Sequence, residues 1–267
     1  MTTPDFVTIA VSVDGAVGRV SLNRPDKLNP LGVETLDELR RAARWFDEQP
    51  DTKVVVVQGE GRVFSAGADI AAFTAGATGG DGMPTGRAAS DMGRRMADAV
   101  EAMRAVTVAR IQGWCVGGAV VLAAACDLRV AAADARFSIP EVDLGIPLAW
   151  GGIPRLVREI GPARTKELVM TCRPFGADEA HQMGFVNRVV PEAELDDVVT
   201  GLAAELAAKA GYALWATKAH TNAVTAEMVG LSRSWADADG LDQGLRDPEG
   251  RDAAARYLES LGRGSRS

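Results

Sequence analysis

The stretch Phe64-Ser65-Ala66-Gly67-Ala68-Asp69-Ile70 places small residues where a backbone N–H group can approach a ligand oxygen closely. It follows the apolar run Val54–Val57, which is typical of a buried strand. A second run of small residues, Cys115-Val116-Gly117-Gly118-Ala119, opens an apolar stretch through Ala125 that predicts a buried helix. Two such turns can offer two main-chain donors to one oxygen and stabilise negative charge that develops on a carbonyl. The sequence therefore predicts an oxyanion hole, as a thioester enolate requires.

A carboxylate stands in apolar surroundings in a third stretch, Phe137-Ser138-Ile139-Pro140-Glu141-Val142-Asp143-Leu144-Gly145. Burial raises the pKa of a carboxyl group, because it disfavours the charged form. A partly desolvated carboxylate is also a stronger base toward carbon than one in water. Glu141 is therefore the candidate catalytic base. A salt bridge from Glu141 to Arg136 or Arg155 is the alternative interpretation.

At these three stretches the sequence resembles the enoyl-CoA hydratase/isomerase family, also called the crotonase family. The resemblance extends over most of the chain, through Leu22–Asn29, Ala124–Arg129 and Phe185–Pro191. It implies an α/β fold of the crotonase-like (ClpP/crotonase) type, a spiral of ββα units with a helical C-terminal region. The implied organisation is a core with the CoA thioester site in residues 1–190 and a helical oligomerisation region in residues 191–267. Homotrimers or homohexamers are the implied assemblies.

The resemblance also implies roles for single residues. The N–H groups of Ala68 and Gly118 correspond to the oxyanion hole, and Glu141 corresponds to the catalytic glutamate. Further positions correspond to contacts with the substrate and its CoA group: Lys27, Leu28, Ala66, Asp69, Ile70, Gly117 and Trp150. Coenzyme A would enter as part of an acyl-CoA thioester substrate, so neither a separate cofactor nor a metal is expected.

One position separates two reactions of the family. Many of its hydratases carry a second glutamate three residues after the oxyanion glycine, and Val121 stands there in this chain. Syn hydration asks two groups to position one water, whereas moving a double bond needs only one base that carries a proton between two carbons. The sequence therefore favours a single-glutamate enoyl-CoA isomerase that shifts the double bond from Δ3 to Δ2. An enoyl-CoA hydratase and a non-catalytic acyl-CoA-binding protein remain alternatives, with a self-associating structural protein as a third.

The segment after Glu141 departs from the family pattern as well. Ala149 stands where some relatives place an aspartate for dienoyl isomerisation or aromatic dehalogenation. The usual Leu-Gly-x-x-Pro-Gly-x-Gly-Gly-Thr is replaced by residues 144–153, which move the proline and add a tryptophan. Trp150 is either an apolar wall for an acyl chain or an ordinary core residue. These changes predict a reshaped acyl pocket.

Composition limits the partners. The 267 residues suit a single α/β domain with a large core. The 36 acidic residues outnumber the 29 basic ones, so no nucleic-acid surface is expected. Arg24, Lys27 and Arg62 lie near motifs where relatives hold the CoA nucleotide, although each alone is typical of a solvated surface charge. Gly59-Glu60-Gly61 lacks the third glycine and the helix of a dinucleotide loop, which argues against NAD.

The cellular compartment is predicted from cysteines and apolar runs. The three cysteines have no Cys-x-x-Cys spacing, which argues against a disulfide framework and a zinc site. No stretch reaches the roughly 18 apolar residues of a membrane span, and the first residues do not resemble an export signal. We therefore expect a cytoplasmic protein without membrane contact.

Apolar periodicity predicts alternating strands and helices. Two alternating segments around Asp14-Gly15 predict a hairpin. Further strands are expected at 107–111 and 128–132, and helices at 36–46, 90–103, 194–209 and 252–261. Residues 71–89 are mostly Ala, Gly, Thr and Asp, which predicts a mobile segment. A lid over the site and a disordered surface insertion are equally compatible with that composition.

Overall fold

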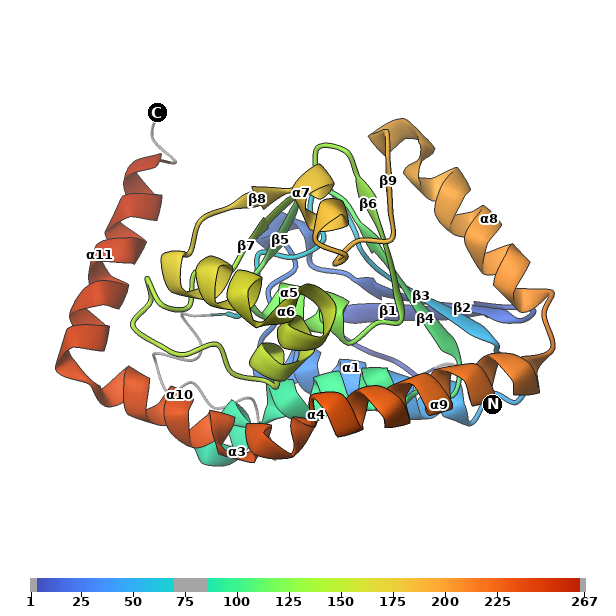
Figure 1. The fold of residues 1–267 in the computed structure, drawn as a ribbon. Coiled ribbons are helices and arrows are strands. Elements are labelled where there is room, and N and C mark those ends of the chain that lie inside the picture. Colours follow the sequence, from blue (N-terminus) through green and yellow to red (C-terminus); the bar gives the residue numbers. More distant parts are fainter. Residues whose placement is uncertain (1–3, 70–85, 265–267) are drawn as a thin grey trace.

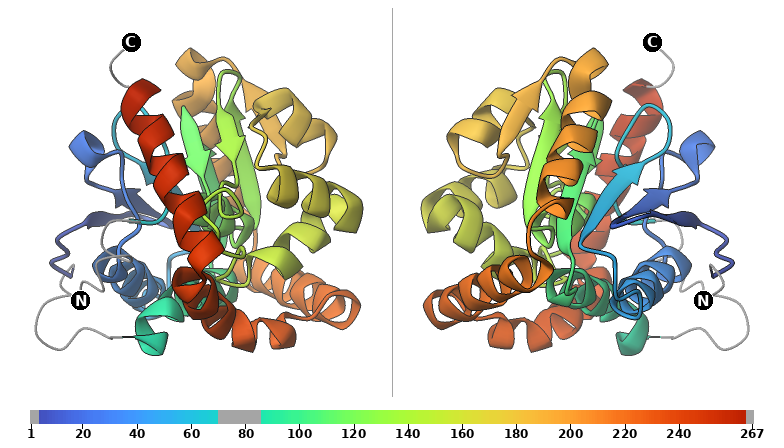
Figure 2. Two further views of the ribbon diagram at one scale, coloured as in Figure 1. Left: turned by 90° about the vertical axis from the view of Figure 1, so that its left-hand side faces the viewer. Right: turned by 90° about the vertical axis from the view of Figure 1, so that its right-hand side faces the viewer.

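A computed structural model describes residues 4–69 and 86–264 of the chain (Figure 1). The predicted substrate contact Ile70 and most of the segment 71–89 lie outside the described residues. Two sheets and the helices packed around them form the described structure, and Figure 2 shows the same arrangement from both sides.

The larger sheet has six strands in the order β1-β2-β3-β4-β6-β9. These are β1 Ile9–Asp14, β2 Val17–Leu22, β3 Val54–Gly59, β4 Val106–Ile111, β6 Leu128–Ala132 and β9 Arg188–Val190. β1 and β2 form the predicted antiparallel hairpin, and the other neighbouring strands of this sheet are parallel. Val54–Val57 is buried along its whole length, because an inner strand of a parallel sheet is covered on both faces.

A second, smaller sheet positions the site. Its strands are β5 Trp114–Val116, β7 Arg136–Ser138 and β8 Phe175–Gly176. β5 and β7 are parallel, and Val116 lies opposite Ser138. Strands of two or three residues show no period-two pattern, which is why they were not predicted from the sequence. Since parallel neighbours end at the same edge, the residues that follow β5 and β7 lie next to one another.

Helices surround the two sheets (Figure 1). They are α1 Val33–Asp47, α3 Arg87–Ser90, α4 Met92–Ala102, α5 Gly118–Ala124, α6 Gly152–Thr171, α7 Ala177–Gln182, α8 Leu195–Ala207, α9 Gly211–Met228, α10 Asp237–Arg246 and α11 Pro248–Gly264. Short 3-10 turns are η1 Pro25–Lys27, η2 Glu192–Glu194 and η3 Leu231–Ala236. α1 packs on α4, α8 crosses the larger sheet, and α5 is buried throughout, as its sequence predicts.

The chain after β9 is helical, as predicted, and its last two helices return to the core. α10 packs against α3, while α11 contacts the segment that follows β7 through Gly250 and Gly145. A Cβ on Gly145 would lie 2.2 Å from Cα of Gly250, so the backbones of these two residues are in direct contact. Within the described ranges, no helix is long and apolar enough to cross a membrane. The domain boundary at residue 190 and the oligomerisation role of the region after it stay predictions.

Candidate active site

Backbone hydrogen bonds hold the first two small-residue stretches together. The N–H of Ser65 donates to the carbonyl of Trp114 at 3.1 Å, and the N–H of Val116 donates to the carbonyl of Ser65 at 3.1 Å. Gly67 has a φ of +90°, and a Cβ there would lie 2.5 Å from the Val116 carbonyl oxygen, so the close approach requires glycine. Ala68 is thereby carried to the start of α5.

The third stretch joins them through the smaller sheet. β5 ends just before Gly117, and the N–H of Gly117 donates to the carbonyl of Ser138 at 2.8 Å at the end of β7. The chain then turns through residues 139–141 and brings Glu141 back beside the start of α5. Segments more than twenty residues apart in sequence therefore meet at one end of this sheet.

Glu141 is buried, with 8% of its surface exposed. Its Oε2 atom accepts no hydrogen bond from the part of the chain that the structure describes. Burial in apolar surroundings raises the pKa of Glu141 from its ordinary 4.5 to about 7. The alternative of a salt bridge to Arg155 is wrong, because Arg155 pairs with Asp98 and Glu101 at 2.9 and 2.6 Å.

Two backbone N–H groups near Glu141 are available to a ligand. Gly118 is the first residue of α5, so its N–H has no acceptor inside the helix. Ala68 lies in a parallel bridge with Leu31, but the bridge uses the carbonyl of Gly67 and the N–H of Asp69. The N–H groups of Ala68 and Gly118 therefore donate to no acceptor among the described residues.

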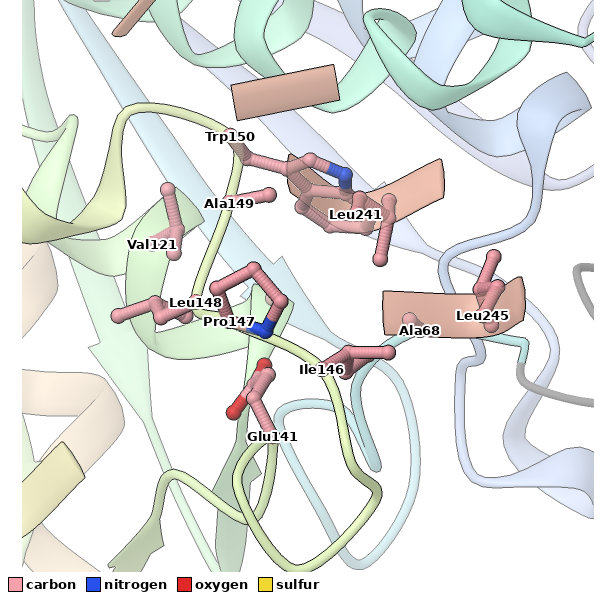
Figure 3. A pocket seen from close by; sticks show the side chains of 11 residues that line it. Ala68, Val121, Glu141, Ile146, Pro147, Leu148, Ala149, Trp150, Leu241 and Leu245 are labelled. Carbon is pink, nitrogen blue, oxygen red and sulfur yellow. The ribbon is translucent and has the colours of Figure 1, made fainter. Parts of the chain in front are cut away.

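Ala68, Gly118 and Glu141 line one pocket (Figure 3). Its cavity volume is ≈ 50 Å³, room for only a few water molecules. The other lining residues are hydrocarbon or aromatic: Val121, Ile146, Pro147, Leu148, Ala149, Trp150, Leu241 and Leu245. Glu141 is therefore the one titratable side chain among the described residues that line this pocket.

The remaining predicted contacts lie outside these walls. Ala66 is exposed, and its N–H donates to the carbonyl of Leu28 at 2.9 Å, which ties the end of η1 to the first stretch. Lys27 is exposed at the same turn, and Asp69 is half-buried. Gly117 does not line the pocket, and its N–H is already bonded to the carbonyl of Ser138. No group of three or more His, Cys, Asp or Glu side chains in the described ranges could hold a metal.

The sequence profile of the enoyl-CoA hydratase/isomerase family matches residues 12–262. The chain belongs to this family. It is 34% identical to a peroxisomal Delta(3,5)-Delta(2,4)-dienoyl-CoA isomerase of Arabidopsis thaliana, over 82% of this chain and 83% of that protein. It is 37% identical to a probable enoyl-CoA hydratase of Mycobacterium bovis, over 73% of this chain and 72% of that protein.

Solved structures agree with the predicted fold. An enoyl-CoA hydratase/isomerase from Mycobacterium paratuberculosis superposes with a TM-score of 0.85 at 26% identity, over 95% of this chain and the whole of that one. The crotonase fold expected from the sequence is thus confirmed. The chain is an enzyme of the enoyl-CoA hydratase/isomerase family, whose named relatives include both hydratases and an isomerase.

Two pocket residues of this enoyl-CoA hydratase/isomerase were missed in the sequence. Leu241 and Leu245 belong to α10 and close the pocket from the C-terminal region (Figure 3). Ala238, Leu241 and Leu245 recur at helical spacing and mark an apolar face of α10. That periodicity predicts a packed helix, but it does not say which cavity the helix covers.

Proposed function

We propose that the chain catalyses the shift of an enoyl-CoA double bond from Δ3 to Δ2 with Glu141 as its only acid–base group. The observation that carries the proposal is Val121, which presents hydrocarbon to the pocket where many family hydratases have a second glutamate. With Glu141 the sole titratable group of the described lining, one proton carrier is available. An isomerisation of this kind requires no more than one.

In the proposed reaction, ionised Glu141 removes a proton from the α carbon, between the thioester carbonyl and the double bond. The electron pair of that C–H bond enters the conjugated system, and negative charge develops on the thioester oxygen. The N–H groups of Ala68 and Gly118 stabilise that oxygen. Protonated Glu141 then delivers the same proton to the γ carbon. The proton that leaves the α carbon is the one that the γ carbon receives, and the double bond moves from Δ3 to Δ2. The reaction therefore needs no further reactant.

The pKa near 7 suits both halves of this cycle. A base that ionises near neutral pH is partly deprotonated in the resting enzyme and returns its proton readily. A protein that only binds acyl-CoA gains nothing from a buried carboxylate, whose desolvation is costly. The buried position of Glu141 therefore supports turnover over the binding-only alternative.

Hydration is the second candidate, because several relatives are named as hydratases. The cavity has room for a water molecule beside Glu141. With hydrocarbon at Val121, however, Glu141 alone would hold that water. Loss of one positioned acid or base typically lowers a rate by about 10²- to 10⁴-fold, so we expect slow hydration at most.

The test is a parallel spectrophotometric assay with Δ3-enoyl-CoA and Δ2-enoyl-CoA. Isomerisation is expected to fall by about 10²-fold or more in Glu141→Gln, which keeps the shape of the side chain but cannot accept the proton. Asp143→Asn is the matched control, because Asp143 is an exposed carboxylate on the same segment. Fast hydration by the parent enzyme, or full isomerisation by Glu141→Gln, would overturn the proposal.

We further propose that coenzyme A binds only as part of the substrate, with Arg24, Lys27 and Arg62 near its phosphates. The exposure of Lys27 and Arg62 leaves both charges available. Substitution of either by alanine should raise KM for an acyl-CoA more than KM for the corresponding acyl-pantetheine thioester. Equal effects on both substrates would contradict this placement.

We propose a cytoplasmic homotrimer or homohexamer assembled through the region 191–267. α9 supports this proposal, since it exposes Tyr212, Trp215, Val224 and Met228. Such apolar side chains on one helix are typical of a protein–protein contact. Light scattering of the purified protein would give the assembly directly, and a monomer at micromolar concentration would contradict it.

A further inference from the structure

The indole of Trp150 fills the space between α4 and α5. A Cβ added to Gly93 in α4 would lie 1.9 Å from Cδ2 of the indole, and one added to Gly118 would lie 2.1 Å from Cζ3. The ring therefore rests directly on both helices at positions that only glycine can occupy. One of these, Gly118, is also the predicted oxyanion residue.

Hydrogen bonds from two helices hold the backbone that carries this indole. Trp150 has a φ of +61°, unusual for a residue with a side chain, and Gly151 follows with +70°. The N–H of Gly151 donates to Oδ2 of Asp237 in α10 at 2.7 Å. The buried guanidinium of Arg155 donates to the carbonyls of Trp150 and Gly151, both at 3.3 Å. Contacts from two helices thus fix an otherwise costly turn.

The indole closes the pocket at the end away from Glu141. Figure 3 shows Trp150 above and Glu141 below, with Pro147 and Leu148 at intermediate height. Trp150 is only 5% exposed, so the cavity does not continue past it to solvent. An acyl chain whose reacting carbons lie over Glu141 would meet the ring after a short distance.

We propose that Trp150 sets the upper limit of acyl-chain length, so that this enzyme takes short-chain acyl-CoA thioesters. The inference rests on the proposed function to the extent that it places the acyl group in this pocket. Extra methylene groups in a longer chain would have to displace the indole from two helices and from a fixed turn. A smaller side chain at position 150 would instead open a channel between α4 and α5, where Gly93 leaves room.

The test measures affinity for saturated butyryl-, hexanoyl- and decanoyl-CoA by calorimetry. Saturated chains cannot isomerise or add water, so the result stands whichever reaction the enzyme catalyses. The parent should bind butyryl-CoA most tightly. Trp150→Ala should bind decanoyl-CoA more tightly than the parent does, by about fourfold for each methylene that finds room, without a similar gain for butyryl-CoA. Trp150→Leu serves as the milder variant if the alanine variant is unstable.

A compensating substitution separates a channel from a general loosening. Gly93→Leu in the Trp150→Ala background projects a side chain into the volume that the indole vacates. It should restore the preference for butyryl-CoA, and Trp215→Phe, which alters an exposed tryptophan on α9, should leave the preference as in the parent. The proposal is overturned if the parent binds decanoyl-CoA as tightly as butyryl-CoA. It is also overturned if the added leucine does not reverse the gain in affinity for decanoyl-CoA. Tightest binding of phenylacetyl-CoA by the parent would overturn it as well, since the indole would then serve to stack on a ring.

Discussion

A Cβ added to Gly117 would lie 2.6 Å from Oε1 of Glu141, closer than a carbon and an oxygen can approach without displacement. The lack of a side chain at Gly117 thus makes the position of the carboxylate possible, whereas the N–H of Gly117 is bonded to Ser138 and is not available to a ligand. The glycine pair 117–118 therefore has two separate consequences. Gly118 offers its N–H to the pocket, and Gly117 leaves the room that Glu141 occupies.

We expect Gly117→Ala to lower kcat/KM for isomerisation by about 10²-fold, because a catalytic group displaced by about 1 Å loses its alignment with the substrate. Gly117 has a φ of +53°, so part of any loss could come from backbone strain alone. Gly15→Ala is the matched control, since Gly15 has a φ of +57° and open space around its Cβ. Equal activity losses in the two variants would contradict the steric explanation.

The pKa of about 7 for Glu141 predicts the pH profile of the reaction. A base must be ionised to remove the α proton, so kcat/KM should rise about tenfold per pH unit below pH 7 and level off above it. The profile is measured with Δ3-enoyl-CoA across this range, with Asp143→Asn as the reference variant. A profile that stays flat from pH 5 to 8 would assign the proton transfer to another group.

The same shift links stability to pH. The pKa of Glu141 is higher in the folded chain than in the unfolded chain. The contribution of the Glu141 carboxyl to the free energy of unfolding is therefore fully present below the unfolded-state pKa of 4.5, and it is lost as the pH rises through the folded-state pKa of about 7. Relative to Glu141→Gln, the parent should lose up to about 3 kcal/mol of unfolding free energy across that interval. Denaturant unfolding of both proteins at pH 5 and pH 8 measures it. A difference that does not change with pH would mean that the carboxyl is not desolvated.

Local patterns in the sequence were sufficient for five of the six strands of the larger sheet and for the buried position of Glu141, whereas the three-residue strand β9 was not predicted. The alternation around Asp14-Gly15 gives the hairpin, and the apolar run at 54–57 gives an inner strand, because burial on both faces leaves a direct trace in the residue types. Glu141 is flanked by apolar residues in sequence, and it is buried in the structure. The fold type came from the family resemblance rather than from any of these patterns.

The walls of the pocket depended on contacts that no local pattern records. Leu241 lies a hundred residues after Glu141, and α10 reaches it only because the C-terminal helices turn back along α3. The position of Trp150 likewise depends on Asp237, through the hydrogen bond to Gly151. The positions of Leu241 and Trp150 both result from contacts between segments that are far apart in the sequence. The sequence alone therefore did not decide whether Trp150 is a wall for an acyl chain or an ordinary core residue.

Asp237→Ala should destabilise the protein by about 1–3 kcal/mol, because the N–H of Gly151 would lose its charged acceptor within a partly buried site. It should also weaken the preference for short acyl chains, since the turn that presents Trp150 would lose its hydrogen bond to α10. Asp239→Ala removes an exposed carboxylate from the same helix, where it pairs with Arg87 at the surface. That variant should change neither quantity; equal effects of both substitutions would indicate a general disturbance of α10.

Val121→Glu tests the basis of the proposed reaction. Restoring the second carboxylate should raise the hydration rate of Δ2-enoyl-CoA by about 10²-fold or more, because two groups could then hold the attacking water. Val121 is fully buried, so the new side chain would pass into the pocket beside Glu141 at some cost in stability. Val121→Gln is the matched control, since it has a similar size and cannot ionise. A gain of hydration in the glutamate variant alone would identify the missing acid as the feature that separates the two reactions. The same rate in both variants, or in the parent, would show that Val121 does not decide between them.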